Sequence, residues 1–449
     1  MIEKIRRFLK KKLHPHLYDL LKNIYNWSKP VIRPIQNFFF NIKLKRVQAN
    51  HEKALKIIQK KEKIKVAFFV IHESVWKYDE LYRLMEQDKR FDPIIVICPY
   101  VVYGEDNMLR EMNQAFNAFN KKGYKTVKTL KENGTWLNVR NEIKPDIVFF
   151  TNPYKLTKEE YYITNFQDII TLYVPYGYMT TNRPIMQYNQ LLHNLVFRFF
   201  LENQFSQQQA IKYSNVKGKN SVVTGYPGLD KNFFYKRNPS PDIWKLKGNR
   251  IKKIIWAPHH TIEKDETLFN YSNFLEYADF FIELAQKYEK QISFAFKPHP
   301  ILRPKLEKLP EWGYERTADY YHKWETLPNC QIIEGDYTDF FLTSDAMIHD
   351  SGSFLVEYIS TNKPSLYMVR NKSILRGFSP FADLIVNCHY LSFNKNDIEN
   401  FINKVVIGCD DYLKDKRQQL IKEHLLPPNG KSASQNIFEE INKLINKHL

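Results

Sequence analysis

From residue 64 onwards, short runs of apolar residues alternate with longer stretches in which apolar positions recur every three or four residues. The short runs have the length of β-strands, and the longer stretches have the periodicity of amphipathic helices. Continuous apolar runs separated by helices are typical of parallel strands that are covered by helices on both faces. The pattern therefore predicts an α/β protein.

The alternation occurs twice, on either side of an Asn-, Lys- and Pro-rich stretch at residues 229–250 that we interpret as a linker. We expect a first α/β domain at 63–228, a second at 251–425 and a C-terminal helix at 426–449. In the first domain the pattern predicts strands Lys65–Ile71, Pro93–Cys98, Asp146–Thr151, Ile169–Pro175 and Arg198–Glu202, with helices Tyr78–Asp88 and Asp106–Lys121. In the second it predicts strands Lys253–Ala257, Gln291–Lys297, Gln331–Glu334, Ala346–His349 and Ser365–Val369, with helices Ser272–Tyr288, Tyr337–Thr343 and Gly352–Thr361. After residues 387–391, helical patterns follow at Asp397–Ile407, Tyr412–Leu425 and Ser432–Leu449.

Two doubly wound, Rossmann-like domains joined by a linker describe the glycosyltransferase-B architecture. In that architecture the donor lies on the C-terminal domain and the acceptor approaches from the N-terminal domain. The length of 449 residues fits two domains with an additional segment.

The additional segment is predicted at residues 1–62, and its apolar residues lie among lysines and arginines. They recur at helical spacing with an interruption at Pro15, and Trp27 and Phe38 to Phe40 follow among further lysines. The positions that form this stripe are Ile2, Ile5, Leu9, Leu13, Leu17, Leu20 and Ile24.

Net charge is concentrated in this basic amphipathic segment. Residues 1–65 contain 18 Lys and Arg against four Asp and Glu, whereas the whole chain has a net charge of +18. A basic amphipathic helix can lie in the headgroup plane of an anionic membrane. The alternative is a helix that packs on the protein with solvated lysines. Binding of nucleic acid is disfavoured because the rest of the chain is nearly neutral.

Other features of the sequence limit the place where the protein acts. No stretch of 18 apolar residues occurs, and no uninterrupted apolar core of a signal peptide follows the first charges. The four cysteines are widely scattered and form no CxxC pair, as expected for reduced thiols. We therefore expect a cytoplasmic protein that is peripheral at the inner face of the membrane.

Three histidine-bearing segments follow predicted strands of the second domain: Pro258-His259-His260, Lys297-Pro298-His299-Pro300 and His349-Asp350-Ser351-Gly352-Ser353. The carboxyl ends of the strands in an open α/β sheet meet in one crevice, where ligands bind. The third segment also begins a predicted helix, whose N-terminus suits a phosphate. The sequence therefore predicts an enzyme that handles a nucleotide-diphosphate donor.

The order of these segments resembles that of the CDP-glycerol glycerophosphotransferase family, whose members build teichoic acids and related surface polymers. The resemblance rests on the His-Pro after an apolar strand, on DYTDFF at 336–341 and on IHDSGSFLVEYISTNKPSLYM at 348–368. It covers residues 252–369 well and the first domain loosely. Where the family has Asp-Tyr-Ser-Ser, this chain has Asp350, Ser351, Gly352 and Ser353.

The resemblance implies a role for His299 beside the donor diphosphate, and Lys297 is a further candidate for a phosphate contact. It also implies that Asp350, Ser351, Gly352 and Ser353 hold the diphosphate, although Asp and Ser are ordinary N-caps as well. His259 and His260 stand where the family has an arginine and are further candidates for the donor site. Glu357 is a candidate to accept hydrogen bonds from the ribose hydroxyls, or is a solvated helix residue. His349 either contacts the donor as a catalytic residue or fills a buried strand end.

The general base is expected in the first domain, where the family has a histidine in a Trp-His-Gly segment. This chain has Tyr176-Gly177 at the nearest match, so His72, which follows the first strand, is the candidate base, with Glu73 beside it. There is no Asp-x-Asp, Gly-x-Gly-x-x-Gly or Walker lysine motif. We therefore expect neither a metal ion nor another cofactor.

Together these features predict a transferase that moves a polyol phosphate from CDP-glycerol or a similar donor to a hydroxyl of a lipid-linked glycan, with release of CMP. Two alternatives remain at this stage. One is a glycosyltransferase of the same fold that uses a nucleotide-sugar. The other is a non-catalytic scaffold on the membrane surface.

Overall fold

The computed structural model describes residues 15–234, 243–248, 250–263, 270–335 and 337–446, and for residues 15–33, 36 and 103 it describes the backbone only. The predicted apolar positions Ile2, Ile5, Leu9 and Leu13 lie outside the described residues, and so do the side chains of Leu17, Leu20 and Ile24.

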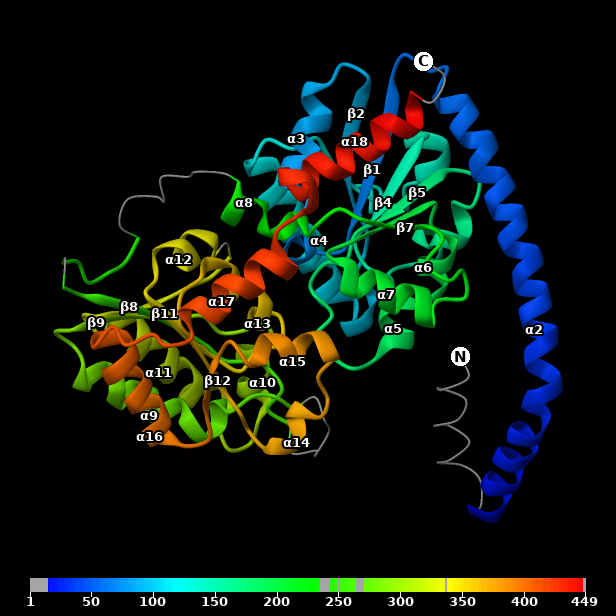
Figure 1. Cartoon of the computed structure of the whole chain (residues 1–449). Helices are drawn as coiled ribbons and strands as arrows, with labels where there is room; N and C mark the ends of the chain where they lie inside the picture. Colours follow the sequence, from blue (N-terminus) through cyan, green and yellow to red (C-terminus); the bar gives the residue numbers. More distant parts are fainter. Residues whose placement is uncertain (1–14, 235–242, 249, 264–269, 336, 447–449) are drawn as a thin grey trace.

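The described part of the basic segment is one 44-residue helix, α2 (Pro15–Ile58), which runs along the first domain (Figure 1). Its C-terminal half is attached through Leu44, Val47, Ala54 and Ile58, which are buried in the core of the first domain. Within the described part of the chain, no helix is both long enough and apolar enough to cross a bilayer.

The first domain contains a seven-stranded sheet in which all neighbouring strands are parallel. In spatial order the strands are β3 (Thr126–Lys128), β2 (Phe91–Ile97), β1 (Ile64–Val70), β4 (Ile147–Phe150), β5 (Ile170–Tyr173), β6 (Arg198–Leu201) and β7 (Ser221–Val223). The helices of this domain are α3 (Asp79–Gln87), α4 (Glu105–Lys121), α5 (Pro184–Tyr188), α6 (Leu191–Leu195), α7 (Gln204–Tyr213) and α8 (Asp230–Phe233).

The second domain contains a six-stranded sheet that is also parallel throughout. Its strands, in spatial order, are β10 (Cys330–Ile332), β9 (Ile292–Phe296), β8 (Lys252–Ala257), β11 (Ala346–His349), β12 (Ser365–Met368) and β13 (Tyr390–Ser392). Its helices are α9 (Phe274–Lys287), α10 (Leu302–Lys308), α11 (Gly313–Thr326), α12 (Thr338–Thr343), α13 (Phe354–Glu357), α14 (Lys372–Leu375), α15 (Pro380–Val386), α16 (Lys395–Asn400) and α17 (Lys414–Leu420). Two parallel sheets with helices confirm the predicted α/β class.

The sequence missed three short strands, β3, β7 and β13, and overestimated one helix. β3 and β7 have three half-buried residues each, so they lack the continuous apolar run that marks a buried strand. The helix predicted over 352–361 is shorter: α13 covers four residues and is followed by a single 3₁₀ turn at Ile359–Thr361.

The last helix, α18 (Ala433–Ile445), returns to the first domain (Figure 1). Its Ile437, Ile441 and Ile445 belong to the same buried cluster as the first sheet. Both carboxylate oxygens of Asp230 accept hydrogen bonds at its N-terminus, from the backbone N–H groups of residues 433 (2.7 Å) and 434 (2.9 Å). The C-terminal segment that was predicted as a separate helix therefore completes the core of the first domain.

The two domains meet through a loop of the first domain, residues 174–183. The backbone N–H of Ser379 donates to the carbonyl of Thr180 (2.8 Å), and the N–H of Asn182 donates to the carbonyl of Gly377 (2.8 Å). These contacts place the loop of the first domain on the side of the second domain where the carboxyl ends of the second domain's strands lie.

Candidate active site

The three predicted histidine segments lie at the carboxyl ends of three adjacent strands. β8 is the middle strand and pairs with β9 on one side and β11 on the other. His259 and His260 follow β8, His299 follows β9, and Asp350 follows β11. The sheet therefore places the side chains at one edge.

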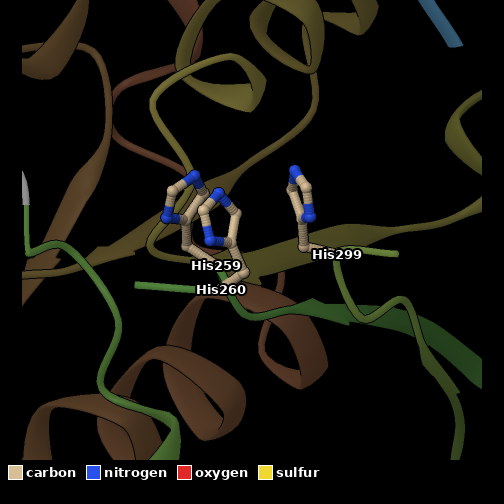
Figure 2. Close-up of side chains that lie close together, drawn as sticks. All are labelled: His259, His260 and His299. Atoms are coloured by element: carbon tan, nitrogen blue, oxygen red, sulfur yellow. The ribbon is translucent and has the colours of Figure 1, made fainter. Parts of the chain in front are cut away.

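His259, His260 and His299 form a compact cluster (Figure 2). The centroid of the His260 ring lies 4.3 Å from that of His259 and 4.2 Å from that of His299, and the remaining pair is 5.4 Å apart. One ring nitrogen of each histidine lies within 4.8 Å of the other two. Such a group can hold either a metal ion or an anion, depending on where its protons are.

The Nδ1 atoms of all three histidines are occupied by hydrogen-bond donors. His299 Nδ1 accepts from the backbone N–H of Ile301 (3.2 Å), and His260 Nδ1 accepts from the Lys305 ammonium (3.1 Å). His259 Nδ1 lies 3.0 Å from the hydroxyl of Thr261. That hydroxyl already accepts from the backbone N–H groups of residues 271 and 272, so its own proton is directed to His259.

These bonds fix the proton of each neutral imidazole on Nε2, because one ring nitrogen of a neutral histidine carries the proton and the other accepts. A protonated Nε2 cannot ligate a metal ion, and the ammonium of Lys305 beside His260 repels a cation. Three N–H groups near one another are suited to an anion instead. The hydrogen bonds of this cluster therefore favour a phosphate group over a metal ion.

The electrostatics of the cluster agree with an anion site. Burial lowers the pKa of His259 to about 3, that of His260 to about 4 and that of His299 to about 2, and the nearby positive charges of Lys305 and, for His299, Lys297 act in the same direction. The free protein therefore carries neutral imidazoles at neutral pH, in a field that attracts negative charge. A bound diphosphate would reverse the sign of this field and raise all three pKa values.

Asp350 holds the loop that carries the histidines. One of its carboxylate oxygens accepts from the backbone N–H of His259 (2.6 Å), and the other accepts from the backbone N–H of Asn273 (2.6 Å) and from its side-chain amide (3.2 Å). The carboxyl is buried, and burial raises its pKa to about 7. This geometry favours a positioning role for Asp350 over the predicted direct contact with the donor.

The segment after Asp350 leads into α13 and lies against the first domain. The hydroxyls of Ser351 and Ser353 are 3.1 Å apart, and Ser353 is exposed to solvent. A Cβ added at Gly352 would lie 3.3 Å from the hydroxyl oxygen of Thr180, so a larger side chain would press on the loop of the first domain. Gly352 thus permits a close approach of the two domains at the strand ends.

Lys297 and Glu357 belong to a second group of side chains beside the cluster. The Lys297 ammonium lies 4.9 Å from the ring centroid of Tyr337 and 5.7 Å from that of Phe354. Burial lowers the pKa of Lys297 to about 8, although the nearby Glu357 opposes this shift. Glu357 accepts a hydrogen bond from the Tyr337 hydroxyl (2.7 Å).

His349 is not part of the cluster. Its side chain is completely buried, and its ring packs against those of Tyr367 and His389, with centroid distances of 5.4 Å and 5.3 Å. Burial lowers its pKa well below the ordinary value. The geometry therefore favours the buried strand-end alternative over the predicted catalytic contact.

His72 follows β1 in the first domain, and its Nδ1 lies 2.6 Å from the Ser74 hydroxyl. Burial lowers its pKa to about 4. The charge of Lys77, five residues after His72, helps to lower the pKa of Lys297, so this loop lies near the second domain. The alternative base Glu73 is paired with Lys122 at 2.6 Å.

Sequence reasoning missed Lys305, Thr261 and Asn273, which orient the histidines. Lys305 lies on α10, 45 residues after His260, and also forms an ion pair with Glu263. Asn273 lies 77 residues before Asp350. No short motif could have linked Lys305 or Asn273 to the histidines, whereas Thr261 directly follows His260 and Tyr337 lies within the DYTDFF segment, so both could have been named.

Residues 196–378 match the model of the family described as CDP-glycerol:poly(glycerophosphate) glycerophosphotransferase. The match covers less than half of the 449 residues, but it spans all three histidine segments. It confirms the resemblance that the sequence motifs predicted. A comparison with curated protein sequences finds no match.

Solved structures show the same fold at low sequence identity. A variant of the wall teichoic acid polymerase TagF is 15% identical with a TM-score of 0.53, over 94% of this chain and 98% of its own. UDP-GlcNAc 2-epimerase from Neisseria meningitidis bound to UDP-GlcNAc is 16% identical with a TM-score of 0.52, over 85% and 100%. The MnaA–UDP structure from S. aureus is 17% identical with a TM-score of 0.51, over 86% and 97%. These similarities confirm the predicted two-domain architecture.

Proposed function

We propose that this chain, a transferase whose residues 196–378 match the CDP-glycerol glycerophosphotransferase family, moves a polyol phosphate from a CDP-linked donor such as CDP-glycerol to a hydroxyl of a membrane-linked glycan. The reaction releases CMP and extends a bacterial surface polymer such as a teichoic acid, a capsule or a lipopolysaccharide.

The observation that carries this proposal is that hydrogen bonds to Nδ1 leave the proton of each histidine in the cluster on Nε2. His259, His260 and His299 each offer an Nε2–H group at the strand ends where an α/β sheet binds ligands. Three neutral donors in a partly buried site are suited to the oxygens of a diphosphate. Lys297 and the hydroxyls of Ser351 and Ser353 lie at the neighbouring strand ends as further candidates.

In the proposed reaction the acceptor hydroxyl attacks the phosphorus that carries the polyol. A new P–O bond forms to the acceptor, and the P–O bond to the phosphate of CMP breaks. Negative charge grows on the oxygen of the leaving CMP, and the Nε2–H groups of the cluster stabilise it there. As this charge grows it raises the pKa of the imidazoles, so the cluster binds the products and the transition state more strongly than a neutral ligand.

The acceptor hydroxyl must lose its proton during this attack, and His72 remains the proposed base. Its position after β1 in the first domain, beside a loop that faces Lys297, supports this role. Its lowered pKa keeps the imidazole unprotonated at neutral pH, which a base requires, although a pKa near 4 makes it a weak base until a ligand changes its surroundings.

The donor is tested by titrating the purified protein with CDP-glycerol, CDP-ribitol and a panel of UDP-sugars while binding and nucleotide release are measured. We expect binding of a CDP-polyol and release of CMP when membranes that contain the acceptor are added. Release of UDP from a UDP-sugar would contradict the proposal and identify a glycosyltransferase, the alternative suggested by the His259–His260 pair in place of the family's arginine. Binding of no nucleotide would leave the scaffold as the remaining alternative.

We further propose that α2 docks the enzyme on an anionic membrane surface. Ile35, Phe38, Phe39 and Ile42 lie on one face of the helix and are 50–65% exposed. At about 100° per residue, this stripe lies on roughly the opposite face from Leu44, Val47, Ala54 and Ile58, which pack on the protein. The exposed stripe is accompanied by basic residues, namely Lys43, Lys45 and Arg46.

Replacing both Phe38 and Phe39 by serine is expected to weaken binding to vesicles at least tenfold, because each buried phenylalanine contributes about 1.5–3 kcal/mol. Sedimentation with phosphatidylcholine vesicles, with and without phosphatidylglycerol, measures the bound fraction. As a control, Tyr314→Ser removes an aromatic side chain of similar exposure (68%) from α11 and should leave binding unchanged. Equal binding of the double variant and the unaltered protein would contradict docking through α2.

A further inference from the structure

A pocket opens in the first domain at the carboxyl ends of β1, β2 and β4. About 560 Å³ of space, which includes open solvent, lies among its lining residues, so a ligand there would be only partly enclosed. Ile71 follows β1, Cys98 follows β2 and Asn152 follows β4, and Leu191 and Leu192 of α6 also line the pocket. None of these residues belongs to the donor site described above.

The lining combines aromatic rings with hydrogen-bonding groups. Tyr154, Tyr161 and Tyr162 contribute rings, and the Lys155 ammonium lies 5.6 Å from the ring centroid of Tyr162. The hydroxyl of Thr157 is buried and makes no hydrogen bond within the described part of the chain. No carboxylate lines the pocket, so nothing in its lining selects a cation.

These groups fit a sugar ring better than a hydrocarbon chain. A sugar places an apolar C–H face on an aromatic ring and presents hydroxyls at its edge, where they can pair with Asn152, Lys155 and Thr157. A hydrocarbon would leave such polar groups without partners, at a cost in binding affinity. An unpaired buried hydroxyl such as that of Thr157 is the kind of group that a polar ligand satisfies.

The pocket is connected to the donor site through one loop of the first domain. Tyr154 and Tyr176 lie close enough for each to influence the pKa of the other, and the carbonyl of Tyr176 accepts from the Tyr226 hydroxyl (2.7 Å). Four residues further on, Thr180 lies against Gly352 and accepts from the backbone N–H of Ser379. At the other side, Ile71 of the pocket wall directly precedes His72.

We propose that this pocket binds a saccharide unit of the acceptor, next to the hydroxyl that reacts. The inference rests on the proposed function for the identification of the ligand as the acceptor, whereas the ligand class follows from the lining. Because the same loop continues to Thr180, which contacts the second domain beside Gly352, a saccharide in the pocket would lie on the side of the first domain that faces the proposed donor site.

The test uses octyl β-glucoside and octyl β-galactoside below their micellar concentrations as probes, with 1-octanol as the probe for a hydrocarbon chain. Dissociation constants are measured by ligand-observed NMR on the full chain without any donor. We expect at least one glycoside to bind at least tenfold more tightly than 1-octanol. Tyr162→Ala should weaken that binding at least tenfold, and Thr157→Val, which preserves the shape of the side chain, at least threefold. Tyr412→Ala, which removes an exposed tyrosine (73%) from the second domain, should have no effect.

The proposal is overturned if neither glycoside binds, if Tyr162→Ala and Thr157→Val bind the glycosides as the unaltered protein does, or if 1-octanol binds as tightly as the glycosides. A separate titration with CDP-glycerol distinguishes failure of this inference from failure of the proposed function. Tyr162→Ala should bind CDP-glycerol with an affinity within twofold of the unaltered protein. Absence of CDP-glycerol binding in every variant would contradict the proposed donor but would leave the result with the glycosides standing.

Discussion

Replacing His299 by alanine should lower kcat for transfer from CDP-glycerol by about 10²–10³-fold, the usual effect of removing one preorganised donor to a developing oxyanion. The substitution removes the Nε2–H group whose proton is fixed by the hydrogen bond from Ile301 to Nδ1. Because this group acts mainly on charge that develops during the reaction, KM for the donor should change much less than kcat. Steady-state release of CMP measures both constants.

Two further variants make this result specific. His299→Gln retains an N–H group close to the position of Nε2 and should recover at least tenfold of the lost activity. His322→Ala removes an exposed histidine from α11 in the same domain and should have full activity. An unaltered kcat in His299→Ala would exclude a role for this cluster in the chemical step, whereas equal losses in all three variants would indicate a general loss of folding.

Acid should destabilise this protein strongly, because many of its histidines are buried and neutral in the folded state. Eight of the 13 histidines have pKa values that are lowered, in each case first of all by burial. They are His51, His72, His193, His259, His260, His299, His349 and His389. In the unfolded chain these side chains bind protons near pH 6.5, whereas in the folded protein they do so only at lower pH.

The unfolded state thus binds more protons below pH 6.5, and the free energy of unfolding falls as the pH falls. As the pH falls from 7.5 to 5.5, each such histidine lowers the free energy of unfolding by about 1 kcal/mol. Asp350 opposes this trend, because burial raises the pKa of its carboxyl to about 7 and the folded state takes up that proton first. The net loss should still be a large part of a typical stability of about 5–15 kcal/mol.

Urea denaturation at pH 7.5 and 5.5 measures this difference. His51→Gln replaces a buried histidine and should reduce the pH dependence by about one proton, whereas His322→Gln should leave it unchanged. A free energy of unfolding that is the same at both pH values would show that the histidines are protonated in the folded state.

The sequence was sufficient to predict the strands that carry the site. Runs such as Ile292–Phe296 are apolar throughout because both faces of a parallel strand are buried, and their ends coincide with a change to polar residues. Adjacent strand ends then brought His259, His260 and His299 to one edge. β3 and β7 have no such run, since they lie at the two edges of the first sheet and remain half-buried.

The chemistry of those side chains could not be predicted, because it depends on contacts between residues that are distant in sequence. Whether the three histidines suit a metal ion or an anion depends on the groups that donate hydrogen bonds to their Nδ1 atoms. One of these groups is the ammonium of Lys305, which lies on α10 and is distant from His260 in the sequence. Asp350 at the start of a helix suggests an N-cap or a ligand contact, but its partners are the backbone at His259 and Asn273. The pocket of the first domain is likewise formed by several separate segments, none of which carries a recognisable motif.

The return of α18 to the first domain has a consequence for the synthesis of the protein. Gly225 lies directly beside Pro427, and a Cβ there would be 2.5 Å from the proline ring, so the chain after β7 and the chain before α18 are tightly apposed. Domains usually fold in order as they leave the ribosome. Here the first domain emerges early but lacks Ile437, Ile441 and Ile445 until α18 has been synthesised. Its core is therefore completed only after the second domain has been made, and until then an apolar surface of the first domain is exposed.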